Sequence, residues 1–227
     1  MLSIINSFVT SSNTTIKSNG RIISSSNSSL KVLEGSGSLA PKQLTPQAFI
    51  ELLLEGSMDI DVQCGETASI EITADDNIVD LIEVSYSGNQ LTIGLKPNTS
   101  FNTNSPIIAK ITNPNLQAVT CKGSGDISVE NLNEPKLAVR IMGSGDVYLS
   151  GKAHSASFDI LGSGDILASA LKADHVTASV MGSCYIELIS IESLTAQVMG
   201  SGDIDVINTP NTVSTTCMGS GSIKVKK

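Results

Sequence analysis

The C-terminal half of the sequence alternates between apolar and polar residues, and the alternation stops at short glycine-rich segments. Apolar or small side chains stand two and four residues before each segment, and a mostly polar residue lies between them. The two columns are Cys121, Ile141, Ile160, Val180, Val198 and Cys217, and Val119, Val139, Phe158, Ala178, Ala196 and Thr215. This is the pattern of a β-strand with one buried face, so a strand is predicted before each segment.

A second strand is predicted after each glycine-rich segment. Its apolar columns are Ile127, Val147, Ile166, Ile186, Ile204 and Ile223, followed two residues later by Val129, Leu149, Ala168, Leu188, Val206 and Val225. The segments read Gly-Ser-Gly-Asp or a close variant and begin at Gly123, Gly143, Gly162, Gly182, Gly200 and Gly219. Their spacing of 20, 19, 20, 18 and 19 residues indicates a solenoid in which each coil stacks on its neighbours.

The predicted fold class is all-β, a parallel β-helix with coils of about 19 residues. Equivalent strands recur in the same direction in every coil, so their ladders are parallel, and such crossovers are overwhelmingly right-handed. A left-handed coil would show an apolar residue at every sixth position. Stepping by six from Ile141 gives Val147, Ala153 and then Asp159, so that period fails.

Three regions are predicted along the chain. Residues 1–55 are expected to form irregular coils of the same solenoid, beginning near residue 16, with weak turn matches at Gly35–Ser38. Residues 56–110 are expected to form an opening coil at Gly56 and an insertion of strands with a hairpin turn at Ser87–Asn89. The insertion also contains possible helical turns at Asp75–Ile82 and an exposed loop at Asn98–Ser105. Residues 111–227 are expected to form the regular β-helix.

Composition narrows the possible partners. Only 3% of the 227 residues are aromatic, as expected for narrow coils with no room for large rings. The net charge of -8, from 14 basic and 22 acidic residues, argues against nucleic acid, because phosphate contacts need clustered Lys and Arg. Cations and neutral sugars remain possible partners.

No cofactor or metal site is predicted. Cys121 and Cys217 share one inward column but lie five coils apart, roughly 24 Å, which is too far for a disulfide. Cys64 and Cys184 show no metal-ligand spacing. His154 and His175 fall in the variable half of their coils, and the sequence pairs no nucleophile with either, so loop histidines are expected.

The N-terminus carries no predicted transmembrane segment. Met1–Val9 is mildly apolar but lacks a basic region and a sustained apolar core, so it is neither a signal peptide nor a membrane span. Two locations follow from this: the cytoplasm, or the cell envelope or exterior if an export signal has been removed.

An aspartate recurs at the fourth position of the turns, at Asp126, Asp146, Asp165 and Asp203. Asp side chains bond nearby backbone N–H groups in turns, so a turn-capping ladder is the favoured interpretation. A cation or ligand site along the same ladder is the alternative.

The residue before each turn forms a further column of Met142, Leu161, Met181, Met199 and Met218. Strict alternation points these side chains outward, where a flexible apolar stripe must be covered. Two interpretations stay open: packing at the glycine corner, slightly favoured, or the interface of a homo-oligomer, for which a trimer is favoured.

The stretch GSMDIDVQCGETASIEITADDNIVDLIEVSYSGNQLTIGLK from Gly56 to Lys96, followed by ITNPNLQAVTCKGSGDI and the repeated turns, resembles the head GIN domain family of auto-transporter adhesins. The resemblance covers about residues 45–227. It implies an exported bacterial protein with a β-helical fold and a role in adhesion. The chain departs from the repeated turn at Met58, Cys184, Tyr185 and Ser222, which counts against a strictly repeated ligand site.

The predicted function is therefore a non-catalytic binding or adhesion module at the cell surface or envelope, with a glycan or a cell-surface protein as partner. The alternative is a polysaccharide-active enzyme of pectin-lyase-like architecture, which needs two carboxylates in one cleft with separated pKa values. The repeating aspartates fit a shared structural role better than such a pair. A left-handed acyltransferase is disfavoured by the failed sixfold period.

Overall fold

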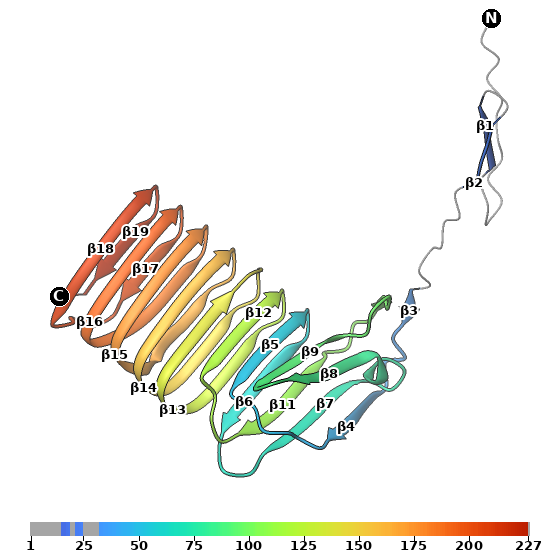
Figure 1. Cartoon of the computed structure of the whole chain (residues 1–227), viewed down its shortest axis with the longest axis horizontal. Coiled ribbons are helices and arrows are strands. Elements are labelled where there is room, and N and C mark those ends of the chain that lie inside the picture. Colours follow the sequence, from blue (N-terminus) through green and yellow to red (C-terminus); the bar gives the residue numbers. More distant parts are fainter. Residues whose placement is uncertain (1–14, 19–20, 25–31, 227) are drawn as a thin grey trace, which may run out of the picture.

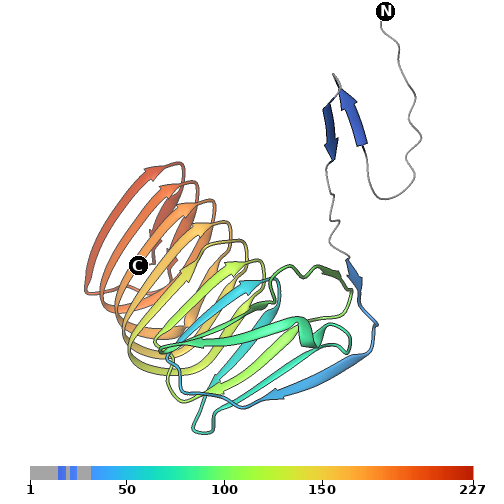
Figure 2. The ribbon, with the colours of Figure 1, turned by 45° about the vertical axis from the view of Figure 1, so that its right-hand side comes forward.

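The computed structural model describes residues 15–18, 21–24 and 32–226, and these residues form β-strands with a single 3-10 helix, η1 (Val79–Leu81). The C-terminal part is a stack of similar coils, seen side by side in Figure 1 and as flattened loops in Figure 2. The solenoid has about 5 turns with coils about 20 residues apart. Its coils wind right-handed from the N-terminal to the C-terminal end (Figure 1). The prediction of a right-handed parallel β-helix is confirmed.

The regular coils are built from four long strands that bend around the solenoid: β13 (Ile127–Ile141), β14 (Val147–Gly162), β15 (Ile166–Gly182) and β16 (Tyr185–Gly200). The stack begins with β5 (Glu51–Gly56) and β12 (Ala118–Gly123) and ends with β17 (Asp203–Val206), β18 (Thr212–Gly219) and β19 (Ser222–Val225). All neighbouring pairs in this stack are parallel. The first glycines of successive turns lie in register, as in Gly162, Gly182, Gly200 and Gly219.

Two broad faces enclose the core. Face A is formed by the strands that lead into the glycine corner: β5, β12, the ends of β13 to β16, and β18. Face B is formed by the strands that leave it, which are the beginnings of β13 to β16 with β17 and β19. Between them lie the predicted apolar columns; for example, Ile127, Val147, Ile166, Ile186 and Ile204 are all 0% exposed. The alternation of apolar and polar residues therefore predicted correctly which side chains are buried.

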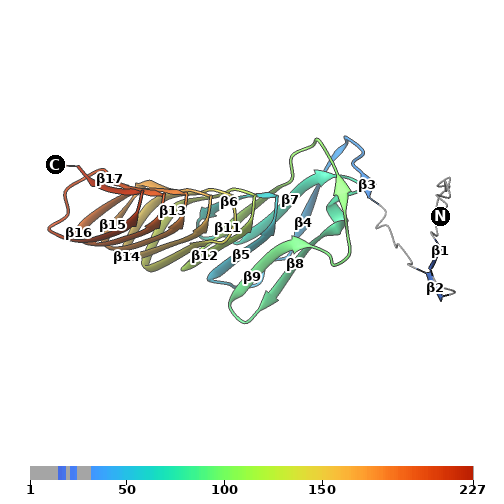
Figure 3. The ribbon, with the colours of Figure 1, turned by 90° about the horizontal axis from the view of Figure 1, so that it is seen from above.

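The N-terminal part extends both faces and covers that end of the core (Figure 3). Face B continues through β6 (Asp59–Cys64) and β11 (Ile108–Asn113) to β7 (Ser69–Asp75) and β4 (Leu39–Leu44), which run antiparallel. Face A continues through β9 (Gln90–Leu95) to the antiparallel β8 (Ile82–Ser87). Phe49, Ile78 and Leu116 are buried beneath this cover.

Three local predictions from the sequence fall in this N-terminal region: a hairpin turn, helical turns and an exposed loop. The two residues between β8 and β9 form the expected hairpin turn, and η1 lies inside the segment expected to contain helical turns. The loop expected at Asn98–Ser105 contains a short strand, β10 (Phe101–Asn102), which pairs in parallel with β3 (Leu33–Glu34). Its side chains are also not all exposed, because the Thr103 hydroxyl donates to the buried Asp75 carboxylate at 2.6 Å.

The weak match at Gly35–Ser38 does not open a coil. The strand that follows it, β4, runs antiparallel to β7, because this segment closes the end of face B instead of stacking on a preceding coil. Further upstream, β1 (Thr15–Ser18) and β2 (Arg21–Ser24) pair antiparallel with each other. The rest of the region up to residue 31 lies outside the described residues, and the boundaries 1–55, 56–110 and 111–227 stay predictions.

Candidate functional site

The turn aspartates form a hydrogen-bonded ladder along the glycine corner. The backbone N–H of Asp146 donates to the Asp126 carboxylate at 2.9 Å, and that of Asp165 donates to the Asp146 carboxylate at 2.8 Å. The ladder begins one coil earlier, where Asp126 N–H donates to Asp59. Each carboxylate thus caps the backbone of the following coil, which explains why the residue recurs with the turn.

The ladder is interrupted where the turn sequence changes. Tyr185 stands at the aspartate position, and its N–H still donates to the Asp165 carboxylate at 2.8 Å. Tyr185 has no carboxylate, so it cannot accept the backbone N–H of the next coil. The N–H of Asp203 bonds the Cys184 carbonyl instead. Asp203 resumes the pattern by accepting from both the N–H and the hydroxyl of Ser222, and the hydroxyl bond is the main cause that lowers the pKa of Asp203. One oxygen of each ladder carboxylate therefore has a structural hydrogen-bond role, and a ligand at the ladder stays the untested alternative.

A different column of outward residues crosses the middle of face B. In register from the N-terminal cover to the last coil it contains Gln43, Glu71, Lys110, Asp61, Ser128, Tyr148, Leu167, Glu187, Asp205 and Lys224. Unlike the inward columns, it does not repeat one residue type. No core contact fixes the identity of an outward residue, so the chemistry of this column can differ from coil to coil.

Two shallow hollows adjoin along this column. The first, with a volume of about 620 Å³, lies over β7, β11, β6 and the start of β13 and is lined by Glu71, Lys110 and Asp61 among others. The second, about 360 Å³, lies over β13 to β16 and is lined by Tyr148, Leu167 and Glu187 among others. Ser128 and Glu130 line both hollows, so the two hollows adjoin on face B and are together called the groove.

Two tyrosines belong to face B. The Tyr148 side chain is 40% exposed in the groove, and burial, followed by the nearby Asp146, Asp126 and Asp165 carboxylates, raises its pKa. The Tyr185 hydroxyl lies 3.2 Å from an Asp205 oxygen and 3.3 Å from a Glu187 oxygen. Burial and these two carboxylates raise the pKa of Tyr185 to about 12, so both phenols keep their protons at neutral pH. The sequence analysis named Tyr185 only as a departure from the repeated turn and did not consider Tyr148. The signal for both was an aromatic side chain at an outward position in a chain with few aromatics.

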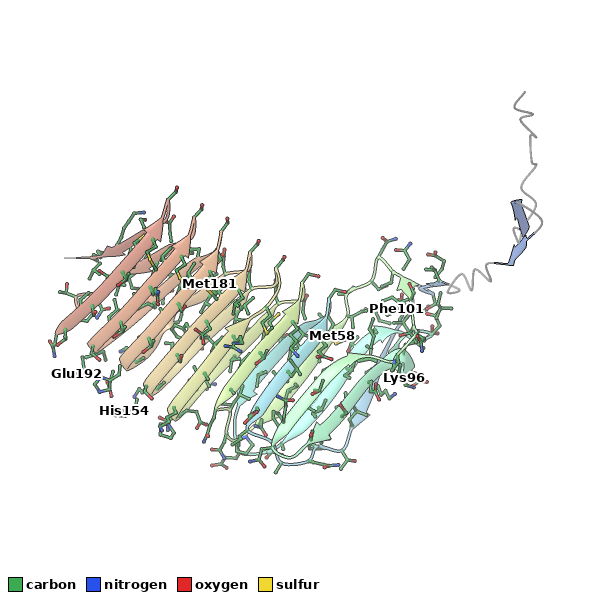
Figure 4. The ribbon with its side chains drawn as sticks, turned by 45° about the horizontal axis from the view of Figure 1, so that its top comes forward. Met58, Lys96, Phe101, His154, Met181 and Glu192 are labelled. Atoms are coloured by element: carbon green, nitrogen blue, oxygen red, sulfur yellow. The ribbon has the colours of Figure 1, made fainter. Side chains whose placement is uncertain are left out.

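The column before the glycine corner points outward on face A. Met142, Leu161, Met181 and Met218 are 39–53% exposed, and Met199 is partly exposed. Figure 4 labels Met181 on its strand in the row of coils. The favoured interpretation, in which the corner turns these side chains into the core, is wrong, because the strand alternation continues unbroken up to the glycine. The apolar stripe is therefore exposed to solvent on the single chain.

The histidines lie on the narrow side between the two faces, and His154 and Glu192 project from the same edge of the stack in Figure 4. His154 Nδ1 lies 2.9 Å from an Asp174 oxygen, and the His154 and His175 rings meet edge to face with centroids 5.1 Å apart. His175 Nδ1 lies 2.9 Å from the Ser193 hydroxyl. The pairing of β15 with β16 shifts by three residues between Ala168 and Lys172 and by one between Ala173 and His175, which brings Ser193 into register with His175. The sequence analysis, which paired no nucleophile with either histidine, did not predict this hydroxyl neighbour.

The described residues offer little for metal or thiol chemistry. Within 15–18, 21–24 and 32–226, no three His, Cys, Asp or Glu side chains are placed to hold a metal ion together. The four cysteines are free, and burial raises the pKa of Cys64, Cys121 and Cys184 to about 11, which keeps these thiols protonated. The same described residues contain no helix that is long and apolar enough to cross a membrane.

Solved structures share this architecture. An adhesin from Bacteroides fragilis, described as putative, is 27% identical with a TM-score of 0.73, and the match covers 86% of this chain and 100% of that one. A Parabacteroides distasonis protein described as a putative adhesin is 21% identical with a TM-score of 0.54, over 86% and 100% of the two chains. Another protein from that species, described as a putative lipid binding protein, is 22% identical with a TM-score of 0.52, over 87% and 100%. No curated protein matches the sequence.

The sequence also matches a family model over residues 48–210, which begins just before β5 and ends after β17. The model is described as "Putative auto-transporter adhesin, head GIN domain". The matched range contains the opening coil, the antiparallel strands β7 and β8 and the coils up to β17, and it leaves out β4, β18 and β19. It therefore includes most of the features that distinguish this chain from a simple repeat. The chain therefore belongs to the head GIN domain family.

Proposed function

We propose that the protein is a non-catalytic adhesion module of the bacterial surface or envelope that binds a neutral glycan in the groove of face B. The observation that supports this most is the groove itself, where Tyr148 stands in the middle of a column of hydroxyl, amide and carboxylate groups. The family and the Bacteroides fragilis relative, both described as adhesins, support the binding role.

The groove chemistry suits an uncharged sugar. A half-exposed tyrosine ring offers an apolar surface to the C–H face of a pyranose, while its hydroxyl remains available for a hydrogen bond. Ser128 and the Glu130 and Glu187 carboxylates can accept hydrogen bonds from sugar hydroxyls. Polyuronides are disfavoured, because Asp61, Glu71 and these glutamates would repel their carboxylates.

The enzyme alternative finds less support. The carboxylates at Asp126, Asp146 and Asp165 each accept a backbone N–H from the next coil, so they are occupied structurally. The pair that departs from the repeat is Glu187 with Asp205, which share the Tyr185 hydroxyl as donor. If the protein is an enzyme, this pair is where its acid and base should be sought.

The test is binding of the purified protein to a panel of neutral and acidic oligosaccharides, followed by calorimetry on the best neutral binder. We expect Tyr148→Ala to weaken binding at least about tenfold, as for loss of a stacking contact. Gln197→Ala on face A is the matched control and should leave affinity unchanged. Binding that is equal in both variants, or tighter binding of polyuronides, would refute the groove assignment. Release of new reducing ends that Glu187→Gln abolishes would favour the enzyme.

The envelope or exterior location is part of the same proposal. A surface adhesin must reach its ligand outside the cell, and the family description points that way. Fractionation of the native host, with protease accessibility of intact cells, tests it; protein found only in the cytoplasm would contradict it.

A further inference from the structure

The N-terminal cover contains a buried carboxylate that belongs to none of the sites described above. Asp75, the last residue of β7, is 1% exposed. Its Oδ2 atom accepts a hydrogen bond from the Thr103 hydroxyl at 2.6 Å. Its Oδ1 atom is shielded from solvent and receives no hydrogen bond of normal geometry from any residue that the structure describes. A buried polar atom without a partner is rare in native proteins, and a bound water or ion is a common explanation.

The Asp75 carboxylate carries a negative charge at neutral pH. Hydrogen bonding by the nearby Thr103 and Ser105 hydroxyls, and more weakly by the Gly37 backbone, lowers the pKa of Asp75, and burial offsets this only in part. These donors are all uncharged, so they stabilise the carboxylate without neutralising it.

The described part of the chain supplies no counter-charge for Asp75. None of its Lys, Arg or His side chains forms an ion pair with this carboxylate. By contrast, the Asp205 Oδ1 atom, which also lacks a hydrogen bond, lies 3.9 Å from Lys224 Nζ. A buried charge is costly unless an opposite charge compensates it. The partner expected at Asp75 is therefore a cation.

Three segments that lie far apart in the sequence meet at this carboxylate: residues 34–38, 75–77 and 101–105. The Ser36 hydroxyl donates to the Asp76 carboxylate at 2.5 Å, and the Gly35 N–H donates to the Asn102 carbonyl at 2.8 Å. The side chains of the three segments are mainly carboxylates, hydroxyls and amides. Such oxygen-rich surroundings suit a hard cation.

Gly35 brings the backbone of the first segment against the carboxylate. A Cβ atom at this position would overlap Asp75 Oδ2 and lie 2.7 Å from the Thr103 hydroxyl oxygen. Gly35 does not have a positive φ, so the carboxylate, and not the local backbone, requires glycine here. Figure 4 labels Phe101 of the third segment in this part of the cover.

We propose that these three segments form a calcium site centred on Asp75. The Asp75 and Asp76 carboxylates supply the negative charge, and hydroxyl oxygens such as those of Ser36 and Thr103, with backbone carbonyls and water, complete the coordination. Calcium takes about six to eight oxygen ligands in a flexible geometry, whereas magnesium demands a near-ideal octahedron, so an irregular cluster of loops favours calcium. Most of the ligands are neutral oxygens, and a third acidic side chain is not needed.

A calcium ion at this place would fasten β3 and β10 to the end of β7. β4, which closes face B, follows directly after residues 34–38, so the ion would stabilise the cover. With only two carboxylates, we expect a dissociation constant of about 0.1 to 1 mM, as in extracellular calcium-binding modules.

The test is thermal unfolding of the full chain after treatment with EDTA, with and without added calcium. Calcium at about ten times its dissociation constant should raise the melting temperature by about 3 to 6 °C. Magnesium at the same concentration should raise it much less. An unchanged melting temperature up to about 10 mM calcium, or an equal shift with magnesium, would overturn the proposal.

Asp75→Asn separates a calcium ligand from a structural hydrogen-bond acceptor. The amide oxygen still accepts from Thr103 and the uncompensated charge is gone, so in EDTA this variant should melt at or above the wild-type temperature. The calcium shift should vanish. Asp80→Asn, at an exposed carboxylate of the same cover that pairs with Lys42 at 2.7 Å, is the matched control and should keep the full shift. A calcium shift that persists in Asp75→Asn would place the ion elsewhere and overturn the site.

Two further measurements locate the ion. Asp76 is exposed, so Asp76→Asn leaves the core intact and should weaken calcium binding about tenfold by calorimetry; unchanged affinity would contradict the ligand set. Calcium should slow amide hydrogen exchange at residues 34–38 and 101–105, and slowing confined to the aspartate ladder would overturn the proposal. Tyr148→Ala should not alter the calcium shift, so the calcium site and the glycan groove can fail separately.

Discussion

At the scale of single residues, the glycine that opens each turn is the most constrained position. Gly182 has a φ of +146°, a region that residues with a side chain rarely adopt. A Cβ atom there would also overlap the carbonyl oxygen of Gly162 in the coil below. The same stacking recurs in every coil, so glycine is required both by its own backbone and by that of its neighbour.

Replacing Gly182 by Ala should therefore destabilise the protein by more than about 3 kcal/mol, because both the backbone and the stacking must change. Gly37→Ala is the matched control: its φ is +75°, but nothing lies within 4 Å of the added atom. We expect it to cost only about 1 kcal/mol. Denaturant unfolding of both variants measures the difference, and equal losses would show that backbone conformation alone, not stacking, requires the glycine.

At the scale of elements, the aspartate ladder joins successive strands at the corner where their backbone ladders are interrupted. Asp146 accepts from the N–H of Asp165, and its own N–H donates to Asp126. These bonds are charge-assisted, yet the carboxylates also repel one another along the column. We therefore expect the acceptor oxygen to matter more than its charge.

Asp146→Ala should lower the free energy of unfolding by about 1 to 2 kcal/mol, because the N–H of Asp165 loses its acceptor. Asp146→Asn should cost less than about 0.5 kcal/mol, since an amide oxygen still accepts and the repulsion is relieved. Asp159→Ala, at an exposed aspartate 3.9 Å from Arg140, should also have little effect. Thermal and urea unfolding provide the comparison. If Asn were as damaging as Ala, the charge itself would be needed, and a bound cation would become the better explanation of the ladder.

At the scale of the whole molecule, the solenoid presents different surfaces on different sides. Face B carries the varied, acidic groove, whereas face A carries the apolar stripe from Met142 to Met218. Beside the stripe runs an outward column of Arg140, Asp159, Ser179, Gln197 and Thr216. A continuous stripe across five coils, roughly 20 Å long, is more than a monomer usually leaves exposed. We therefore retain the proposal that the stripe is the side-by-side contact of a trimer. A trimer would present several grooves together, so that weak glycan contacts combine.

Replacing Met181 and Met199 together by Lys should divide the mass of the assembly by three, because charge would replace the apolar contact without entering the core. Light scattering measures this, and circular dichroism checks that the variant is folded. His154→Lys, on the narrow side, is the control and should keep the wild-type mass. Unchanged mass in the double variant would remove the stripe as an interface.

The repeat, the strand direction and the inward columns could all be predicted from the sequence, because each coil's pattern is local and is copied in the next. Ile166, for example, is predicted to point inward from the pattern of its own coil, whatever the position of that coil in the stack. The turn chemistry was also local, since glycine and aspartate are required by the corner itself. The family resemblance rested on the same segments together with the insertion after Gly56.

Only the tertiary structure decided features that depend on contacts between distant segments. The antiparallel cover arises because β11 inserts between β6 and β7. β11 is far from both strands in the sequence, and no periodicity of the sequence predicts this pairing. The groove depends on this cover, since Glu71 and Lys110 reach the column of Tyr148 only through it. Whether the glycine corner turns the Met stripe inward also needed coordinates. The alternation of residue types predicts whether a side chain points inward or outward. Its exposure also depends on whether another strand packs over it, which the sequence pattern does not show.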